Sequence, residues 1–85
     1  MDEIILVDGT KIKTDFFVRA PGRVQFTAYG LSMLEAAQIF SDTTKTEVMS
    51  VKGENDFFDL YRGYTKMTVM IMQGDHLKIS MEEVQ

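Results

Sequence analysis

The feature that most constrains the fold of this chain is the spacing of turn-forming pairs between short runs of aromatic and β-branched residues. Asp8-Gly9, Pro21-Gly22 and Gly74-Asp75 are pairs that suit tight turns, and short strand-like runs lie on both sides of each pair. A chain divided in this way folds by pairing neighbouring strands. The sequence therefore predicts a mostly antiparallel β domain.

Two hairpins are expected in the first third of the chain. The first joins Ile4–Val7 to Thr10–Lys13 through the Asp-Gly pair, which favours a type I′ turn with positive φ at both central residues. The second joins Asp15–Arg19 to Val24–Tyr29 through the Pro-Gly pair. A type II turn fits there, because proline fixes φ and glycine accepts a positive φ. Together these segments predict three strands before the helix.

One short amphipathic helix is expected near the middle of the chain. Ser32 and Glu35 form a capping-box pattern, in which each side chain satisfies a free amide at the start of a helix. Ser, Asp and Thr follow from position 41 and end the helix, because such side chains compete for backbone hydrogen bonds. Apolar residues at spacings of three and four predict one buried stripe, made of Met33, Ala36, Ala37 and Phe40.

Four more strands are expected after the helix, and the placement of the turns favours a meander. In the last strand apolar and polar residues alternate strictly, as one buried and one solvated face require. The Gly-Asp pair before it suits a type II′ turn. The four segments are Thr46–Lys52, Phe57–Arg62, Tyr64–Met72 and His76–Glu82. The expected class is therefore α+β and mostly antiparallel, in the order β-β-β-α-β-β-β-β, either as a twisted sheet curling around the helix or as a small, partly open barrel.

Length and composition limit the chain to one domain, residues 1–85, and to few kinds of chemistry. A chain of 85 residues holds one core, and the lack of cysteine excludes disulfides, thiolate metal sites and cysteine nucleophiles. The acidic start Met1-Asp2-Glu3 is unlike a signal peptide, and no apolar stretch approaches the ~20 residues of a membrane helix. We therefore expect no export by a signal peptide, no membrane partner, and an intracellular or virion setting.

No set of residues in the sequence supports catalysis, and neither a cofactor nor a metal is expected. His76 is the only histidine, so a partly exposed position at a strand end is favoured over a metal or relay site. Glu54, Asp56 and Asp59 lack the calcium-loop pattern, so a solvated acidic loop is the favoured interpretation. The six glycines are spaced as strand punctuation and form no phosphate-binding loop. We expect that the protein is not an enzyme.

Aromatic residues in the second half raise the alternative of nucleic-acid binding. Phe57, Tyr61 and Tyr64, with Arg62 between the tyrosines, could stack unpaired bases on a sheet face. The net charge of -4 repels phosphates on average, and aromatic residues in short strands usually fill cores. Nucleic acid is therefore a disfavoured partner.

Methionine is frequent, with seven residues, and three of these lie close together in one predicted strand. Met67 and Met70 differ in parity, so a regular strand would point them to opposite faces. Methionine adapts well to recognition surfaces, but filling gaps in a small core is its commoner use. Core packing is the favoured interpretation, and a binding face is the alternative.

The stretch LSMLEAAQIFSD, residues 31–42, followed by YRGYT, residues 61–65, resembles small accessory proteins encoded by phages and prophages of Gram-positive bacteria. The resemblance covers mainly the second half of the chain, from the helix through the last hairpin. It implies a phage origin and protein binding, and it transfers no site residue. The expected location is the host cytoplasm or the virion.

The expected function is a non-enzymatic, phage-type protein-interaction module, with two alternatives for its partner. An inhibitor of a host defence protein, anti-CRISPR-like, would imitate phosphates with Glu54, Asp56, Asp59 and Glu82-Glu83, although such charges often only keep a small domain soluble. A virion or assembly accessory would pair an exposed edge strand with a phage structural protein or with a second copy. The remaining interpretation is a single-stranded nucleic-acid-binding module that uses the Tyr/Arg sheet face.

Overall fold

The computed structural model describes residues 2–54 and 58–84. Within them the elements follow the expected order: β1 (Asp2–Ile5), β2 (Lys11–Ala20), β3 (Arg23–Tyr29), α1 (Met33–Phe40), β4 (Val48–Lys52), β5 (Phe58–Arg62), β6 (Lys66–Gln73) and β7 (His76–Glu82). All strand pairs are antiparallel. The predicted α+β class, mostly antiparallel with one short helix, is confirmed.

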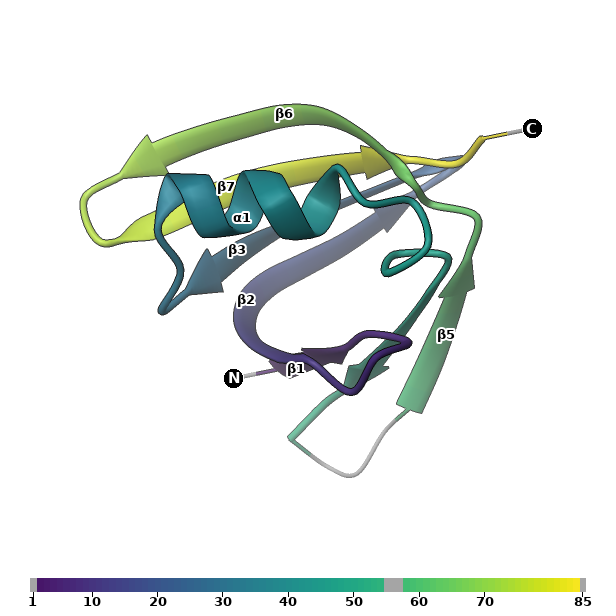
Figure 1. Ribbon diagram of the computed structural model, residues 1–85. Coiled ribbons are helices and arrows are strands. Elements are labelled where there is room, and N and C mark those ends of the chain that lie inside the picture. The colour runs from purple at the N-terminus through teal and green to yellow at the C-terminus, as the bar shows by residue number, and fades with distance from the viewer. Residues whose placement is uncertain (1, 55–57, 85) are drawn as a thin grey trace.

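The strands form one sheet in the order β5-β4-β1-β2-β3-β7-β6. β5 and β6 follow each other in the chain but lie at opposite edges of the sheet, so the meander expected for the second half is wrong. The reason is that the β6–β7 hairpin pairs with β3, while β4 and β5 extend the sheet beyond β1. The sheet remains open and curls around α1 (Figure 1). We call the face that carries α1 the inner face and the opposite one the outer face.

The helix begins with the predicted capping box. The Ser32 Oγ accepts a hydrogen bond from the Glu35 amide at 3.1 Å, and the Glu35 carboxylate accepts one from the Ser32 amide at 3.2 Å. Ala36 and Phe40 are fully buried, as predicted. Met33, expected in the same stripe, is 42% exposed, because the first turn of α1 lies at the end of the sheet beside the β6–β7 turn (Figure 1). No helix in the described residues is long and apolar enough to span a membrane.

Part of the core lies between α1 and the inner face of β3 and β7, and the rest lies against the inner face of β1, β2, β4 and β5. The rings of Phe26 and Phe40 meet at 5.7 Å between centroids, which joins the helix to the centre of the sheet. The alternation predicted for β7 places Leu77, Ile79 and Met81 in the core. Their neighbours on β3 are paired as Ala28 with Leu77, Phe26 with Ile79 and Val24 with Met81.

Two of the three predicted turns have the expected conformation. Gly74 has a φ of 63° at the first central position of the β6–β7 turn, as type II′ requires. Gly22 has a φ of 70° at the second central position of the β2–β3 turn, which fits type II behind Pro21. In both cases a two-residue loop fixes the register of the strands that it joins.

The first turn differs from the prediction. Gly9 has a φ of 88°, but Asp8 is not among the residues with positive φ, so a type I′ turn is wrong. The Gly9 amide donates to the Leu6 carbonyl at 3.0 Å and the Leu6 amide donates to the Thr10 carbonyl at 2.9 Å. This is a three-residue loop with glycine in the left-handed position, the next commonest way to close a hairpin.

Two β-bulges interrupt the alternation of inner and outer side chains. In β2 the register with β3 shifts between Asp15 and Val18, and Phe16 has a φ of 53°, the only positive φ at a described residue other than glycine. In β6 the register with β7 shifts between Met67 and Val69. Because of this second bulge, Met67 and Met70 both pack against the core, so the prediction that they face opposite sides is wrong.

Candidate interaction site

The binding residues proposed from the sequence gather on and beside β5, at one edge of the sheet. β5 is a five-residue strand that, within the part of the chain the structure describes, pairs only with β4. In chain order the described residues of this group are Glu54, Asp59, Tyr61, Arg62 and Tyr64. Asp56, and Phe57 of the proposed base-stacking face, lie outside the described residues.

Tyr61 and Tyr64 belong to the core and do not form an exposed platform. Their relative exposures are 6% and 5%, and their rings meet edge to face with centroids 5.8 Å apart. The rings of Phe17 and Tyr61 meet with centroids 5.0 Å apart, and the Arg19 guanidinium lies 5.6 Å from the Tyr61 ring centre. The base-stacking face considered from the sequence is therefore wrong for these two rings, because neither has a free side.

The Asp59 carboxylate is held by its own strand. It accepts a hydrogen bond from the Tyr61 hydroxyl at 3.0 Å and another from the Leu60 amide at 3.0 Å. Burial raises the pKa of Tyr61 to about 12, with a further contribution from the bond to Asp59. Asp59 is half-buried, in contrast to the solvated acidic loop expected from the sequence.

The acidic residues considered as phosphate mimics lie at different ends of β5. Glu54 precedes this strand in the β4–β5 connection, whereas Glu83 follows β7, and its neighbour Val84 donates from its amide to the Gly63 carbonyl at 2.9 Å. In Figure 1 the start of β5 and the end of β7 accordingly lie far apart. The described acidic side chains thus do not form one continuous row.

The two edges of the sheet differ in how their backbone groups are satisfied. On β5, Asp59 and Tyr61 pair with β4, and the Leu60 amide points outward to the Asp59 carboxylate. A side chain that covers an edge amide is one way in which proteins protect an exposed edge. One of the outward amides of β5 is therefore already occupied.

β6 is the longer edge strand, with eight residues. Gln73 and His76 flank a two-residue loop and exchange hydrogen bonds, and bonded and non-bonded pairs alternate from there. The backbone groups of Met70 and Met72 consequently point away from β7. Among the described residues, no further backbone hydrogen bond uses these groups.

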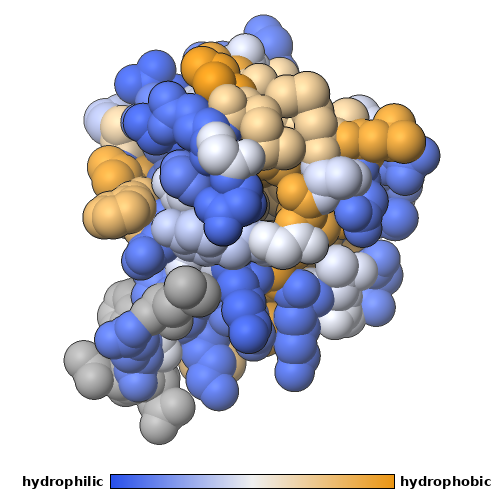
Figure 2. All heavy atoms as spheres, turned by 90° about the vertical axis from the view of Figure 1, so that its left-hand side faces the viewer, coloured by the Kyte–Doolittle hydropathy of each residue, from blue (hydrophilic) through white to orange (hydrophobic). Residues whose placement is uncertain are grey.

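Apolar side chains lie beside this open edge. Val69 and Ile71 are exposed on the outer face, and Met72 is exposed near the end of the strand. Figure 2 looks at the end of the molecule that carries the β6–β7 turn, and it shows apolar side chains gathered in the upper part, at the height of β6 and α1 in Figure 1, above a hydrophilic lower part. The β6 edge therefore combines free backbone groups with apolar surroundings.

His76 is partly exposed at the start of β7, as the sequence predicted. Its Nδ1 lies 3.4 Å from the Asp75 carboxylate, and its ring lies 5.7 Å from that of Tyr29. Residues 2–54 and 58–84 contain no group of three or more histidine or acidic side chains placed to hold a metal ion.

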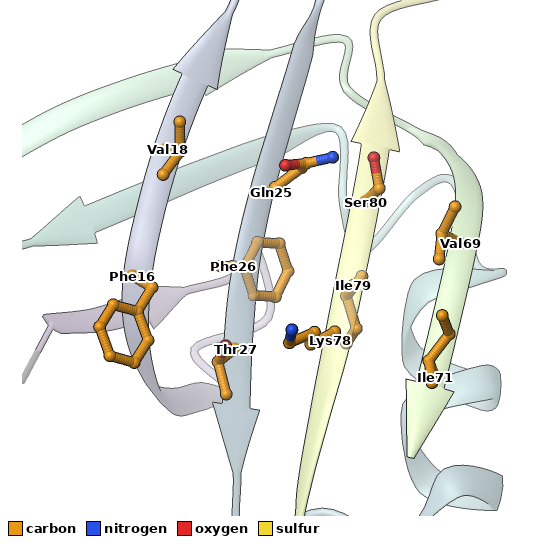
Figure 3. A pocket seen from close by; sticks show the side chains of 10 residues that line it. All are labelled: Phe16, Val18, Gln25, Phe26, Thr27, Val69, Ile71, Lys78, Ile79 and Ser80. Atoms are coloured by element: carbon orange, nitrogen blue, oxygen red, sulfur yellow. The ribbon is translucent and has the colours of Figure 1, made fainter. Parts of the chain in front are cut away.

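A groove on the outer face has no counterpart among the residues chosen from the sequence. It has a volume of about 310 Å³ and lies across β2, β3, β7 and β6 (Figure 3). Its exposed apolar side chains come from the two outer strands and its polar side chains from the two central ones: Phe16, Val18, Val69 and Ile71, and Gln25, Thr27, Lys78 and Ser80. The bulges that create this arrangement are not marked by glycine, so sequence reasoning had no signal for it.

No protein-family model matches the chain, and no curated protein or solved structure matches it at a significant level. We therefore base the function on the geometry of the described residues.

Proposed function

We propose that this chain is a non-enzymatic, phage-type protein-interaction module that binds an extended segment of its partner along the free edge of β6. The observation that supports this is the outward direction of the Met70 and Met72 backbone groups on an eight-residue edge strand. Unpaired groups of this kind are a template for adding a strand to a sheet. The main-chain hydrogen bonds provide affinity.

The side chains around the edge would provide specificity. Val69 and Ile71 lie on the outer face and Met72 on the inner one, so a partner strand would meet apolar neighbours on both sides. Methionine adapts its shape to different partners, because its side chain is unbranched and flexible. The partner segment is accordingly extended and apolar at alternate positions.

A virion or assembly accessory fits this geometry better than a phosphate-mimicking inhibitor. Mimicry needs a row of accessible carboxylates, whereas Asp59 is bound by Tyr61 and Leu60, and Glu54 and Glu83 lie at different ends of β5. Recognition through backbone and apolar groups is also weakly sensitive to salt. The partner is a phage structural protein, or a second copy of the chain through the same edge.

Proline substitutions at neighbouring positions of β6 separate binding from folding. The Met72 amide faces the open edge, so Met72→Pro removes a donor that the fold does not use. The Ile71 amide bonds to β7, so Ile71→Pro should destabilise the domain by about 3 kcal/mol. Met72→Ala is the control for loss of the side chain.

The test is affinity capture from host lysate and from phage-infected lysate, with the bound proteins identified by mass spectrometry. We expect the wild type and Met72→Ala to retain a phage structural protein at low and high salt, and Met72→Pro to lose it. A partner that Met72→Pro retains would contradict the edge proposal. Capture of a basic host protein that is released by high salt, and that Glu54→Gln no longer binds, would favour the inhibitor function instead. Substrate turnover by the pure protein would exclude a non-enzymatic role.

A further inference from the structure

Both walls of the outer-face groove are produced by β-bulges. In β2, Thr14 faces the core, so a regular continuation would have placed Phe16 and Val18 on the inner face as well, and the bulge moves both to the outer face. In β6 the extra residue Thr68 moves Val69 and Ile71 to the same face. Two independent irregularities therefore place apolar side chains on opposite sides of one groove.

Phe16 is held in a conformation that folding alone does not explain. Its φ of 53° lies in the left-handed region that bulky residues avoid, and its side chain is 72% exposed, so the core gains little from it. Strained residues of this kind concentrate at binding and active sites. The strain at Phe16 marks the groove as a functional surface.

The floor of the groove carries hydrogen-bond donors on β3 and β7. The register places Thr27 beside Lys78 and Gln25 beside Ser80, and Figure 3 shows the Gln25 side chain reaching from β3 towards β7. Lys78 is exposed and has no ion pair among the described residues. Ser80 is only 3% exposed, and its Oγ has no hydrogen-bond partner. A buried hydroxyl without a partner is costly, and an acceptor on a ligand would satisfy it.

We propose that this groove binds a small aliphatic carboxylate. It does not use the backbone groups of the β6 edge, although Val69 and Ile71 border both sites. The apolar walls match a hydrocarbon body, and the Lys78 ammonium with the hydroxyl and amide donors matches a carboxylate head. The volume of about 310 Å³ lies at the lower end of the range for small-molecule sites.

The dimensions of the groove exclude a second copy of the chain as its occupant. Along the strands it covers two outward-facing positions, about 7 Å, and across the sheet it covers four strands, about 14 Å, which gives a patch of about 100 Å². A standard protein interface needs about 800 Å² on each partner. The groove is thus too small to be the main contact with a folded protein, and it is large enough for a short hydrocarbon chain.

The first test is a titration of ¹⁵N-labelled protein with octanoate and, separately, with 1-octanol, followed by NMR. Octanoate should cause saturable shifts confined to β2, β3, β6 and β7, and octanol should bind about tenfold more weakly because it lacks the charge. Lys78→Met should weaken octanoate binding by about tenfold and leave octanol binding unchanged. Lys52→Met, an exposed lysine on β4, is the matched control and should change neither.

A second pair of variants tests the buried hydroxyl. Ser80 and Thr14 both have a buried side-chain oxygen without a partner, but Thr14 lies on the inner face, paired with Ala28. Ser80→Ala should keep or raise the melting temperature and weaken octanoate binding, whereas Thr14→Val should keep or raise it without affecting binding.

Several results would overturn the proposal. The first two are the absence of saturable octanoate shifts and shifts centred on α1. The third is octanoate binding that Lys78→Met does not change. The fourth is that the protein binds a peptide with a free apolar C-terminus but does not bind octanoate. Met72→Pro should bind octanoate normally, so failure of the groove and failure of the β6 edge remain distinguishable.

Discussion

Replacing Phe16 by glycine should give a more stable protein than replacing it by alanine, which reverses the usual order for a strand. A Cβ atom in the left-handed region costs about 1–2 kcal/mol, and Phe16 has a φ of 53°. In an ordinary strand, glycine is about 0.5–1 kcal/mol less stable than alanine, because it loses more conformational freedom on folding. At position 16 glycine should therefore exceed alanine by about 0.8 kcal/mol.

The comparison with the wild type follows from the exposure of the ring. Phe16 is 72% exposed, so the buried remainder contributes only about 0.5 kcal/mol. Phe16→Ala loses this contribution and keeps the strain, and should fall about 0.5 kcal/mol below the wild type. Phe16→Gly loses it and releases the strain, and should be close to the wild type or slightly above it.

Urea denaturation of the three proteins measures these differences. Val18 provides the control, because it lies in the same strand, is 55% exposed and has no positive φ. Val18→Gly should be less stable than Val18→Ala by about 0.5–1 kcal/mol. If glycine is also the less stable variant at position 16, by a similar margin, the backbone at Phe16 is not strained and the strain argument for the groove fails.

Three further predictions concern the core and the helix. Stability should fall between pH 10 and 12, because the pKa of Tyr61 is about 10 in the unfolded chain and raised to about 12 in the folded one, so the unfolded state loses its proton first. Denaturation curves at successive pH values should show this decline in the wild type and a smaller one in Tyr61→Phe, and equal declines would contradict the assignment. Ser32→Ala removes the N-cap of α1 and should cost about 1 kcal/mol in thermal unfolding, with no change expected if the capping box is absent in solution. Phe40→Ala removes the ring that joins α1 to β3 and should lower the free energy of unfolding by about 3–5 kcal/mol, whereas a loss below 1 kcal/mol would mean that the helix does not pack as described.

The parts of the fold that the sequence predicted are those with local causes. The capping box at Ser32 and Glu35 depends on residues three positions apart, and the type II′ turn depends on Gly74 and its neighbour. The alternation in β7 likewise needs only one buried face. Each of these signals depends on a few neighbouring residues, so it can be interpreted without knowing how the rest of the chain folds.

The parts that the sequence missed depend on contacts between distant segments. The pairing of β3 with β7 separates β5 from β6, and no turn signal encodes it. The bulge that gives Phe16 its positive φ has neither glycine nor asparagine to mark it. Tyr61 and Tyr64 have the composition of a binding surface, but both rings lie in the core, Tyr61 on β5 and Tyr64 just after its end.

The most direct test of the central claim is amide hydrogen exchange at β6, measured with and without the captured partner. In the free protein, the Met70 and Met72 amides should exchange fast and the Ile71 amide slowly, because of these three only Ile71 donates to β7. On binding, exchange at Met70 and Met72 should slow, while the outward amides of β5 stay unchanged. Slow exchange at both methionines in the free protein, or no change in the complex, would contradict an open β6 edge that receives a partner strand.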